Sequence, residues 1–424
     1  MSGEQAFSSG PGVPPATVPP ELLRRPRRRG NLIFTVVVSI AMLVGAGVMC
    51  IVLLLSNAPD ALAVGVVLAA LPVGPVIASF LWLDRYEPEP VPLLVMAFGW
   101  GALVATAAAL VLQVVDQFVL RTPDSWTGAI VAPITEEAAK GLFILLLVWS
   151  RRRVIDGVLD GIVYAGMVGV GFAFTENILY LGGAYVGGGD MGSGGLGSAI
   201  TLFVIRGIFS PFAHPLFTAF IGIGVGVAVV SRTRTWRLLA PLLGYFVAVI
   251  AHGSWNGSAF FAEGRLFMLT YLFAMVPAFL LLAGFAVWAR SREGRMLTRS
   301  LTDCSRRGLL DASEVPWLVR LPARRNSRRF ARAYGGKVAD RVMREYQQQA
   351  VELGFLHDRY LRGMPPPDLA QRGSAMVQRL RALRPYVRFP PASASTGPST
   401  GPPTRPTSGP PHRTQSQAQW EVGR

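Results

Sequence analysis

The chain has 424 residues, of which 51% are hydrophobic and only 16% are charged, and its formal net charge is +16. Soluble domains carry a charge on about a quarter of their residues, so this composition excludes an ordinary soluble protein and indicates a membrane protein. The arginines lie in the N-terminal leader, in short loops and in the tail after residue 290, where membrane topology requires them. We therefore expect no nucleic-acid partner. With only two cysteines, the chain has no cysteine framework for disulfides or a metal cluster.

The chain begins with a leader, residues 1–30, that is rich in Pro, Gly and Ser and ends in RRPRRR. We expect this leader to be disordered and cytoplasmic. The apolar run behind it is too long for a signal peptide, so we expect a first membrane helix that stays attached. Runs of roughly 20 apolar residues, the length that crosses the hydrocarbon core, predict an all-α fold of about eight transmembrane helices within residues 31–290. The predicted spans are 31–55, 61–83, 92–118, 129–149, 155–182, 200–230, 237–260 and 267–289.

Arginine sets the predicted orientation of these spans. The leader, the loops that follow every second span and the tail are basic, whereas the opposite loops hold only Arg121 and Arg265. By the positive-inside rule both termini are cytoplasmic, in a multi-pass protein of the plasma membrane. A composition dominated by Arg, Ala, Gly and Val, with Lys140 and Lys337 as the only lysines, fits a high-GC bacterial genome.

After the last span, residues 291–387 are expected to form a cytoplasmic helical tail. Apolar side chains recur at helical spacing over residues 326–361, among arginines and glutamines. Residues 388–424 consist mainly of Pro, Ser, Thr and Gly, which cannot bury a core, so we expect disorder there.

Ionisable residues are concentrated in the middle spans, although a charge at the centre of a membrane helix costs at least about 2.5–3.5 kcal/mol. Such groups usually face a cavity or one another. These groups include Glu136, Glu137 and Lys140 in the fourth span, Glu176 in the fifth, Arg206 and His214 in the sixth, and His252 in the seventh. At a rise of 1.5 Å per residue, the two glutamates of the fourth span, Glu176 and the two histidines all fall in the outer half of the bilayer, which indicates a shared site.

Helical spacing predicts which of these groups meet. Glu136 and Lys140, four residues apart, share a face, while Glu137 points about 100° away. His252 and Asn256 also share a face. Two histidines and a glutamate are a common ligand set for a catalytic zinc, and a further glutamate can take a proton from the attacking water. Asn256 or a histidine can donate to an oxyanion instead.

Four stretches of the sequence match a known pattern in order along successive spans, namely TEEAAKG, GFAFTENILY, FAHPLFTAF and AHGSWNG. Together they resemble the PrsW family of intramembrane proteases, which is related to the CAAX-prenyl endopeptidases and the Abi proteins. The resemblance covers roughly residues 31–290. It implies an eight-helix fold and the cleavage of membrane-anchored substrates, with anti-sigma factors as the known type.

The resemblance is carried over residue by residue. Glu136 and Glu137 match the family's double glutamate, Glu176 the FxxxE position, His214 and His252 the two histidines, and Asn256 the terminal asparagine; Lys140 stands where related proteases often have arginine. We predict Glu136, Glu137, Lys140 and Asn256 as catalytic residues, and Glu176, His214 and His252 as ligands of a metal ion, expected to be zinc. The residues leave a metal-free glutamate mechanism open.

The buried charges allow three interpretations. The first is a protease that cuts membrane-anchored proteins near the extracytoplasmic face. The second is a proton- or cation-coupled transporter or channel that uses the same acids and histidines, but a relay should run through the whole membrane, and these groups cluster at one depth. The third is a non-catalytic scaffold whose cytoplasmic tail recruits partners, which leaves the cluster from four spans unexplained. The sequence favours the protease.

Overall fold

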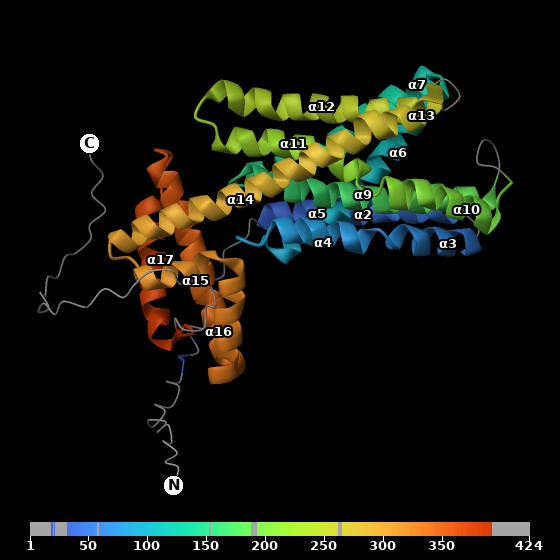
Figure 1. The fold of residues 1–424 in the computed structure, drawn as a ribbon. Coiled ribbons are helices and arrows are strands. Elements are labelled where there is room, and N and C mark those ends of the chain that lie inside the picture. The colour runs from blue at the N-terminus through green and yellow to red at the C-terminus, as the bar shows by residue number, and fades with distance from the viewer. Residues whose placement is uncertain are drawn as a thin grey trace, which may run out of the picture. The chain divides into compact units, whose positions relative to one another are not determined.

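The structure, a computed structural model, describes residues 18, 19, 21, 32–56, 59–151, 154–187, 193–261 and 265–391. These residues form helices and contain no strand, which confirms the all-α fold (Figure 1). The predictions of disorder for the leader, residues 1–30, and for the tail, residues 388–424, fall almost wholly outside the described residues.

The chain divides into two compact units. The first comprises residues 28–292, and the second contains residues 293–424 together with residues 1–27. The helices of the first unit are α2 (Leu32–Ser56), α3 (Pro59–Ala70), α4 (Val73–Leu83), α5 (Val91–Gly99), α6 (Thr106–Val115), α7 (Asp124–Trp126), α8 (Ala132–Ser150), α9 (Val158–Val186), α10 (Gly195–Phe203), α11 (Ala213–Val230), α12 (Arg234–Phe260), α13 (Arg265–Thr270) and α14 (Val276–Arg306), whose last residues belong to the second unit. Short π-helical segments join several of them: η1 (Trp100–Ala105), η2 (Asp116–Leu120), η3 (Thr127–Val131), η5 (Val204–Phe209) and η7 (Tyr271–Met275).

Seven helical segments of the described chain are long and apolar enough to cross a membrane, so the chain is a polytopic membrane protein. The expected eighth span, residues 129–149, forms α8 and the end of η3. It differs from the seven because three charged side chains fall within its 19 residues. The seven segments are Leu32–Leu55, Pro59–Leu83, Val91–Leu120, Val158–Val186, Gly195–Val230, Arg234–Phe260 and Arg265–Arg306.

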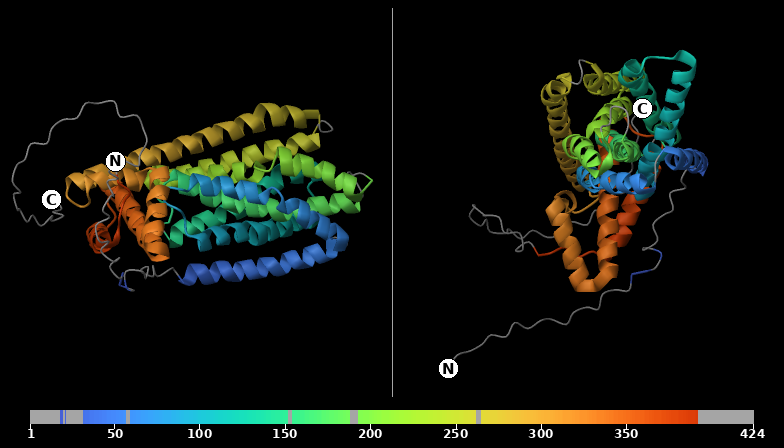
Figure 2. Two further views of the ribbon diagram at one scale, coloured as in Figure 1. Left: turned by 60° about the horizontal axis from the view of Figure 1, so that its bottom comes forward. Right: turned by 90° about the vertical axis from the view of Figure 1, so that its right-hand side faces the viewer.

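The helices at the edges of the first unit expose large apolar side chains. Figure 2 shows the blue α2 at one edge and the golden α14 at the opposite edge. Leu43 of α2 is 75% exposed and Leu281 of α14 is 74% exposed. A soluble protein rarely leaves such continuous apolar faces in water, so these faces contact lipid.

The long helix α9 lies at the centre of the first unit, where it packs against α11 on one side and α3, α4, α5 and η1 on others. Small residues permit these close approaches. A Cβ atom on Gly161 would come within 2.1 Å of the carbonyl oxygen of Gly222 in α11, and one on Gly101 in η1 would come within 1.9 Å of the carbonyl oxygen of Val168. The close packing around α9 therefore requires glycine, which has no Cβ atom, at these contacts.

The sixth predicted span, residues 200–230, is not one continuous helix. It runs through α10 and η5, breaks at Ser210–Phe212, and resumes as α11. Pro211 lies in the break, and His214 is the second residue of the new helix. Interrupted helices are tolerated at membrane depth where the freed backbone groups line a cavity or are buried in protein, and π-helical segments are frequent at functional sites.

The second unit is also helical. It contains α15 (Val315–Val319), α16 (Leu321–Leu361) and α17 (Leu369–Leu383), with a kink in α16 at Gly335 and Gly336. The buried carboxylate of Glu314 accepts hydrogen bonds from Tyr346 and Arg384 and so ties this unit together.

The Gly161 contact gives a test of the packing around α9. We expect Gly161→Ala to lower the free energy of unfolding by at least about 1–3 kcal/mol, because the new methyl group overlaps backbone that cannot move away. Gly284→Ala in α14 is the matched control, since a Cβ there meets nothing within 4 Å. The measurement is reversible unfolding in mixed detergent micelles. Equal stabilities of the two variants would contradict this account of the packing.

Candidate active site

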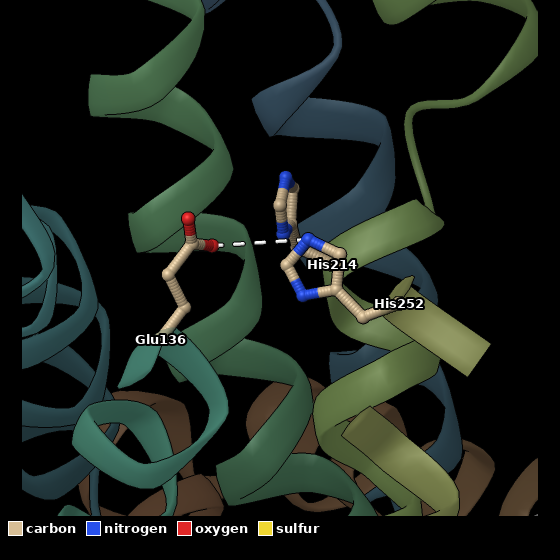
Figure 3. A group of neighbouring side chains, drawn as sticks. All are labelled: Glu136, His214 and His252. Atoms are coloured by element: carbon tan, nitrogen blue, oxygen red, sulfur yellow. Dashed lines mark ion pairs between the residues drawn. The ribbon is translucent and has the colours of Figure 1, made fainter. Parts of the chain in front are cut away.

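The structure brings the ionisable side chains of four helices together. Figure 3 shows Glu136, His214 and His252 pointing toward one another from three of these helices. The predicted residues come from α8 (Glu136, Glu137 and Lys140), α9 (Glu176), α11 (His214) and α12 (His252 and Asn256).

The carboxylate of Glu137 is fully buried and joins three helices. Its Oε1 atom accepts hydrogen bonds from Lys140 Nζ at 2.8 Å and from His252 Nδ1 at 3.0 Å. Its Oε2 atom accepts one from the hydroxyl of Thr218 at 3.1 Å. An ionised carboxylate accepts hydrogen bonds and cannot donate them. The contact with Glu137 therefore places the proton of the neutral His252 ring on Nδ1.

That assignment leaves Nε2 of His252 with its lone pair. Nε2 is buried and has no hydrogen-bond partner in the described chain. The nearest acid is Glu136, whose Oε2 lies 3.8 Å away. The ring is held in this orientation because it stacks on Phe217 at a centroid distance of 4.8 Å.

The ring of His214 is assigned in the same way. Its Nε2 lies 2.7 Å from Oε2 of Glu176, and its Nδ1 lies 3.1 Å from Nζ of Lys140. Because an ammonium group can only donate, Nδ1 accepts, and the N–H is Nε2–H, donated to Glu176. Each histidine thus gives its N–H to a carboxylate, and each keeps one lone-pair nitrogen for another partner.

Lys140 supplies a positive charge in the interior of the site. Besides Glu137 and His214, its Nζ atom contacts Oε2 of Glu136 at 3.3 Å and lies 3.6 Å from the centre of the Phe172 ring. A buried carboxylate pair without a nearby cation would be strongly destabilising, so Lys140 allows Glu136 and Glu137 to lie next to each other.

Arg206, in the π-helical segment η5, provides the second cation. It donates to the carboxylate of Glu176 and, through Nε, to Oδ1 of Asn177 at 2.6 Å. Its guanidinium group lies 4.1 Å from the centre of the Tyr180 ring. Arg206 therefore fixes Glu176, and through it His214.

A cavity of about 840 Å³ borders this cluster. Glu136, Glu176, His214 and Asn256 line it, together with Arg206. Glu137, Lys140 and His252 are fully buried and do not belong to its lining. The cluster thus has an accessible layer at the cavity and a supporting layer behind it.

Asn256 lies on the cavity wall and is partly buried. Its side-chain amide donates a hydrogen bond to the carbonyl oxygen of Gly128 at 3.0 Å. This bond joins α12 to η3 beside the cavity, so the amide is held in a fixed orientation at the place where a substrate would lie.

The residues present fit a metal ion. One ligand atom each from Glu136, His214 and His252 lies within 4.8 Å of the others. A tetrahedral zinc ion with bonds of 2.0–2.1 Å holds its ligand atoms about 3.4 Å apart, so the three groups would have to approach one another by up to about 1.4 Å. The orphaned Nε2 of His252 is the atom that such an ion would satisfy.

The sequence predicts Glu176 rather than Glu136 beside the two histidines. In the structure Glu176 contacts the Nε2 side of His214, whereas Glu136 contacts His252 and belongs to the group that can hold a metal. The roles of both residues remain predictions.

Several contacts of the site were not expected from the sequence. Gln113 of α6 donates to Oε1 of Glu136 at 3.4 Å, Thr218 supports Glu137, and Asn177 supports Arg206. Two of these had a signal, because Thr218 follows His214 by one helical turn and Asn177 follows Glu176 directly. For Gln113 the only signal in the sequence is a polar side chain within an apolar run.

The described residues thus form a multi-span helical membrane protein with a buried Glu/His cluster beside a cavity. Residues 89–282 match the sequence model of the "PrsW family intramembrane metalloprotease". These residues thus form a PrsW-family domain, which confirms the resemblance read from the motifs, and the chain is a peptidase.

Relatives with the name Protease PrsW support this. The chain is 25% identical to the protein of Geobacillus kaustophilus (strain HTA426) over 177 residues, which are 41% of this chain and 72% of the relative. It is 24% identical to that of Bacillus subtilis (strain 168) over 192 residues, 45% of this chain and 81% of the relative. It is 24% identical to that of Clostridioides difficile (strain 630) over 185 residues, 42% and 73% respectively. No solved structure matches.

The buried carboxylate of Glu137 makes a prediction about stability. Glu137→Gln should lower the free energy of unfolding by about 3–5 kcal/mol, because it leaves Lys140 with one carboxylate fewer in a buried site. Asp124→Asn removes an exposed carboxylate from the rim of the same cavity and should change stability by less than about 0.5 kcal/mol. Thermal unfolding in detergent measures both. A Glu137→Gln variant as stable as the wild type would show that this carboxylate does not hold the helices together.

Proposed function

We propose that this peptidase hydrolyses peptide bonds of membrane-anchored proteins near the extracytoplasmic face, with anti-sigma factors as the substrate type. The observation that carries the proposal is the group formed by Glu136, His214 and His252, whose ligand atoms lie within 4.8 Å of one another beside a cavity that Glu136 and His214 line. A substrate segment in that cavity would meet the side chains that hydrolysis needs.

We assign the metal ligands to Glu136, His214 and His252, with zinc as the expected ion. Such an ion, when bound, supplies a polarised carbonyl group and a water of lowered pKa. Glu137 and Glu176 hold the two histidine rings by accepting their N–H groups, which is the usual arrangement around histidine ligands. This exchanges the roles first predicted for Glu136 and Glu176.

The carboxylate that takes a proton from the attacking water has to border the cavity. Glu137 does not border it, and Glu136 is a ligand in this assignment, which leaves Glu176. Its Oε2 atom already accepts hydrogen bonds from His214 and Arg206, so the proton from the water would go to Oε1. Asn256 also lines the cavity, and its amide can donate to the carbonyl oxygen under attack.

The position of the site supports cleavage near the extracytoplasmic face. Glu136 is the fifth residue of α8, and His252 lies in the last third of α12. With both termini cytoplasmic, as the arginine distribution predicts, both positions lie toward the outer ends of their helices. The proposed membrane domain is residues 31–290, and the proposed cytoplasmic tail is residues 291–387.

The transporter alternative requires a polar path through the rest of the membrane. On α8 the side chains that follow Lys140 toward the predicted cytoplasmic end include Phe143, Ile144 and Leu147, all fully buried and apolar. The polar cluster therefore ends in packed hydrocarbon on that side, which supports hydrolysis at a one-sided site.

A comparison of cells tests the activity. Wild-type cells are compared with cells that carry Glu136→Gln or His252→Ala, and the new N-termini of membrane proteins and of shed segments are identified by mass spectrometry. We expect fragments that appear only with the wild type and with Asp60→Asn, a control at an exposed carboxylate outside the cavity lining. Identical fragments in all strains, with all variants present in the membrane, would contradict proteolysis, and ion flux would then be measured.

Metal analysis tests the ligand assignment. The purified wild type should hold one zinc or a comparable ion per chain and lose activity with chelators. Glu136→Gln should lower the metal content at least about tenfold, because a ligand is lost, whereas Glu176→Gln should retain the metal and lose activity. Loss of metal in Glu176→Gln alone would restore the assignment predicted from the sequence. Activity that survives chelators in a metal-free protein would favour the glutamate mechanism.

A further inference from the structure

We infer that Lys140 is a tethered cation that takes the place of the metal ion in the metal-free site and withdraws from two of the three metal donors when the ion binds. This inference rests on the metal site of the proposed function. It gives Lys140 the role of a positioning residue that keeps the site assembled between metal-loaded states.

The contacts of Nζ carry the inference. Lys140 Nζ lies 3.1 Å from Nδ1 of His214 and 3.3 Å from Oε2 of Glu136. These atoms belong to two of the three residues that can hold a metal ion. The Nδ1 lone pair can bind either an N–H group or a metal ion, so the ammonium group and the ion compete for it.

The remaining contacts of Lys140 show where the ammonium group can stay. Nζ lies 2.8 Å from Oε1 of Glu137 and 3.6 Å from the centre of the Phe172 ring. Neither group belongs to the candidate metal donors. Lys140 can therefore give up His214 and Glu136 and still keep an ion pair and a cation–π contact. The flexible stem of lysine permits such a movement.

The charge balance explains why a cation is needed there. Glu136 and Glu137 are adjacent, buried and negatively charged, and Lys140 contacts both of them. A divalent ion on Glu136 would bring its own positive charge, and repulsion between the two cations would then favour withdrawal of the ammonium group. Lys140 thus stabilises the metal-free protein and lowers the affinity of the site for metal.

Arg206 provides the matched comparison. It is the other cation of the cluster and is paired with Glu176, but it has no contact with His214 Nδ1 or Glu136 among those that the structure describes. Replacement of either residue removes one positive charge from the site. Only the replacement of Lys140 also frees metal donors, so the two variants separate competition from a general effect of charge.

The test measures metal affinity and stability, not activity. Zinc affinity of the full-length protein in nanodiscs is determined by competition with a chromophoric chelator for the wild type, Lys140→Met and Arg206→Met. We expect Lys140→Met to bind zinc at least about tenfold more tightly than the wild type. Arg206→Met should bind zinc no more tightly than the wild type, because it frees no metal donor and loosens Glu176, which holds the His214 ring. The metal-free Lys140→Met protein should unfold at a lower temperature, and zinc should raise this temperature more than in the wild type. Unchanged or weaker zinc binding by Lys140→Met would overturn the inference.

A second measurement uses a protein that retains Lys140. The chain has only two lysines, and Lys337 is exposed in the second unit. A Lys337→Arg protein labelled with ¹³Cε-lysine gives a single lysine signal in NMR spectra, which reports on Lys140 alone. We expect zinc to move this signal in proportion to the metal bound.

The outcomes separate the inference from the proposed function. Zinc that binds stoichiometrically without moving the Lys140 signal would refute the inference and leave the metal site intact. A wild-type protein that binds no metal would refute the proposed metal site, and the inference with it.

Discussion

The arrangement of the membrane domain depends on one fully buried carboxylate, that of Glu137. It accepts hydrogen bonds from Lys140 of its own helix, from His252 of α12 and from Thr218 of α11. A buried ion pair contributes little net stability, but loss of one partner is costly. The carboxylate therefore acts mainly as a constraint: the helices pack so that every donor around it is satisfied, and this packing fixes the ring of His252 with Nε2 on the side of Glu136.

The rest of the domain accommodates this constraint. The break before α11 places His214 in the first turn of a helix, beside Glu176 and Lys140. Close packing of α9 against α11 at Gly161 and Gly222 brings the two helices near enough for these contacts. The apolar faces of the edge helices that contact lipid have, among the described residues, no buried polar group to satisfy. For these faces, sufficient length and hydrophobicity are enough for the helix to cross the bilayer.

Much of this arrangement could be predicted from the sequence, because hydrophobic runs and the expense of buried charge are properties of the residues themselves. Helix lengths predict the spans, and the depths of Glu136, Glu176, His214 and His252 predict that they converge. Helical spacing correctly pairs Glu136 with Lys140. It does not reveal that Lys140 also contacts Glu137 and His214, or which glutamate meets which histidine, since these depend on how neighbouring helices rotate and where the sixth span breaks. Gln113 could not be singled out for the same reason.

The two layers of the cluster have different consequences for chemistry. Glu136, Glu176 and His214 border the cavity, whereas Glu137 and Lys140 are fully buried and do not line it. In a region that excludes water, hydrogen bonds and charges act more strongly than at a surface, so the hidden layer can hold the accessible one rigidly. The cavity that we propose for a peptide segment borders only the accessible layer. That asymmetry suits a hydrolase, which needs a preorganised surface for one substrate, and it does not suit a relay, which needs a second exit.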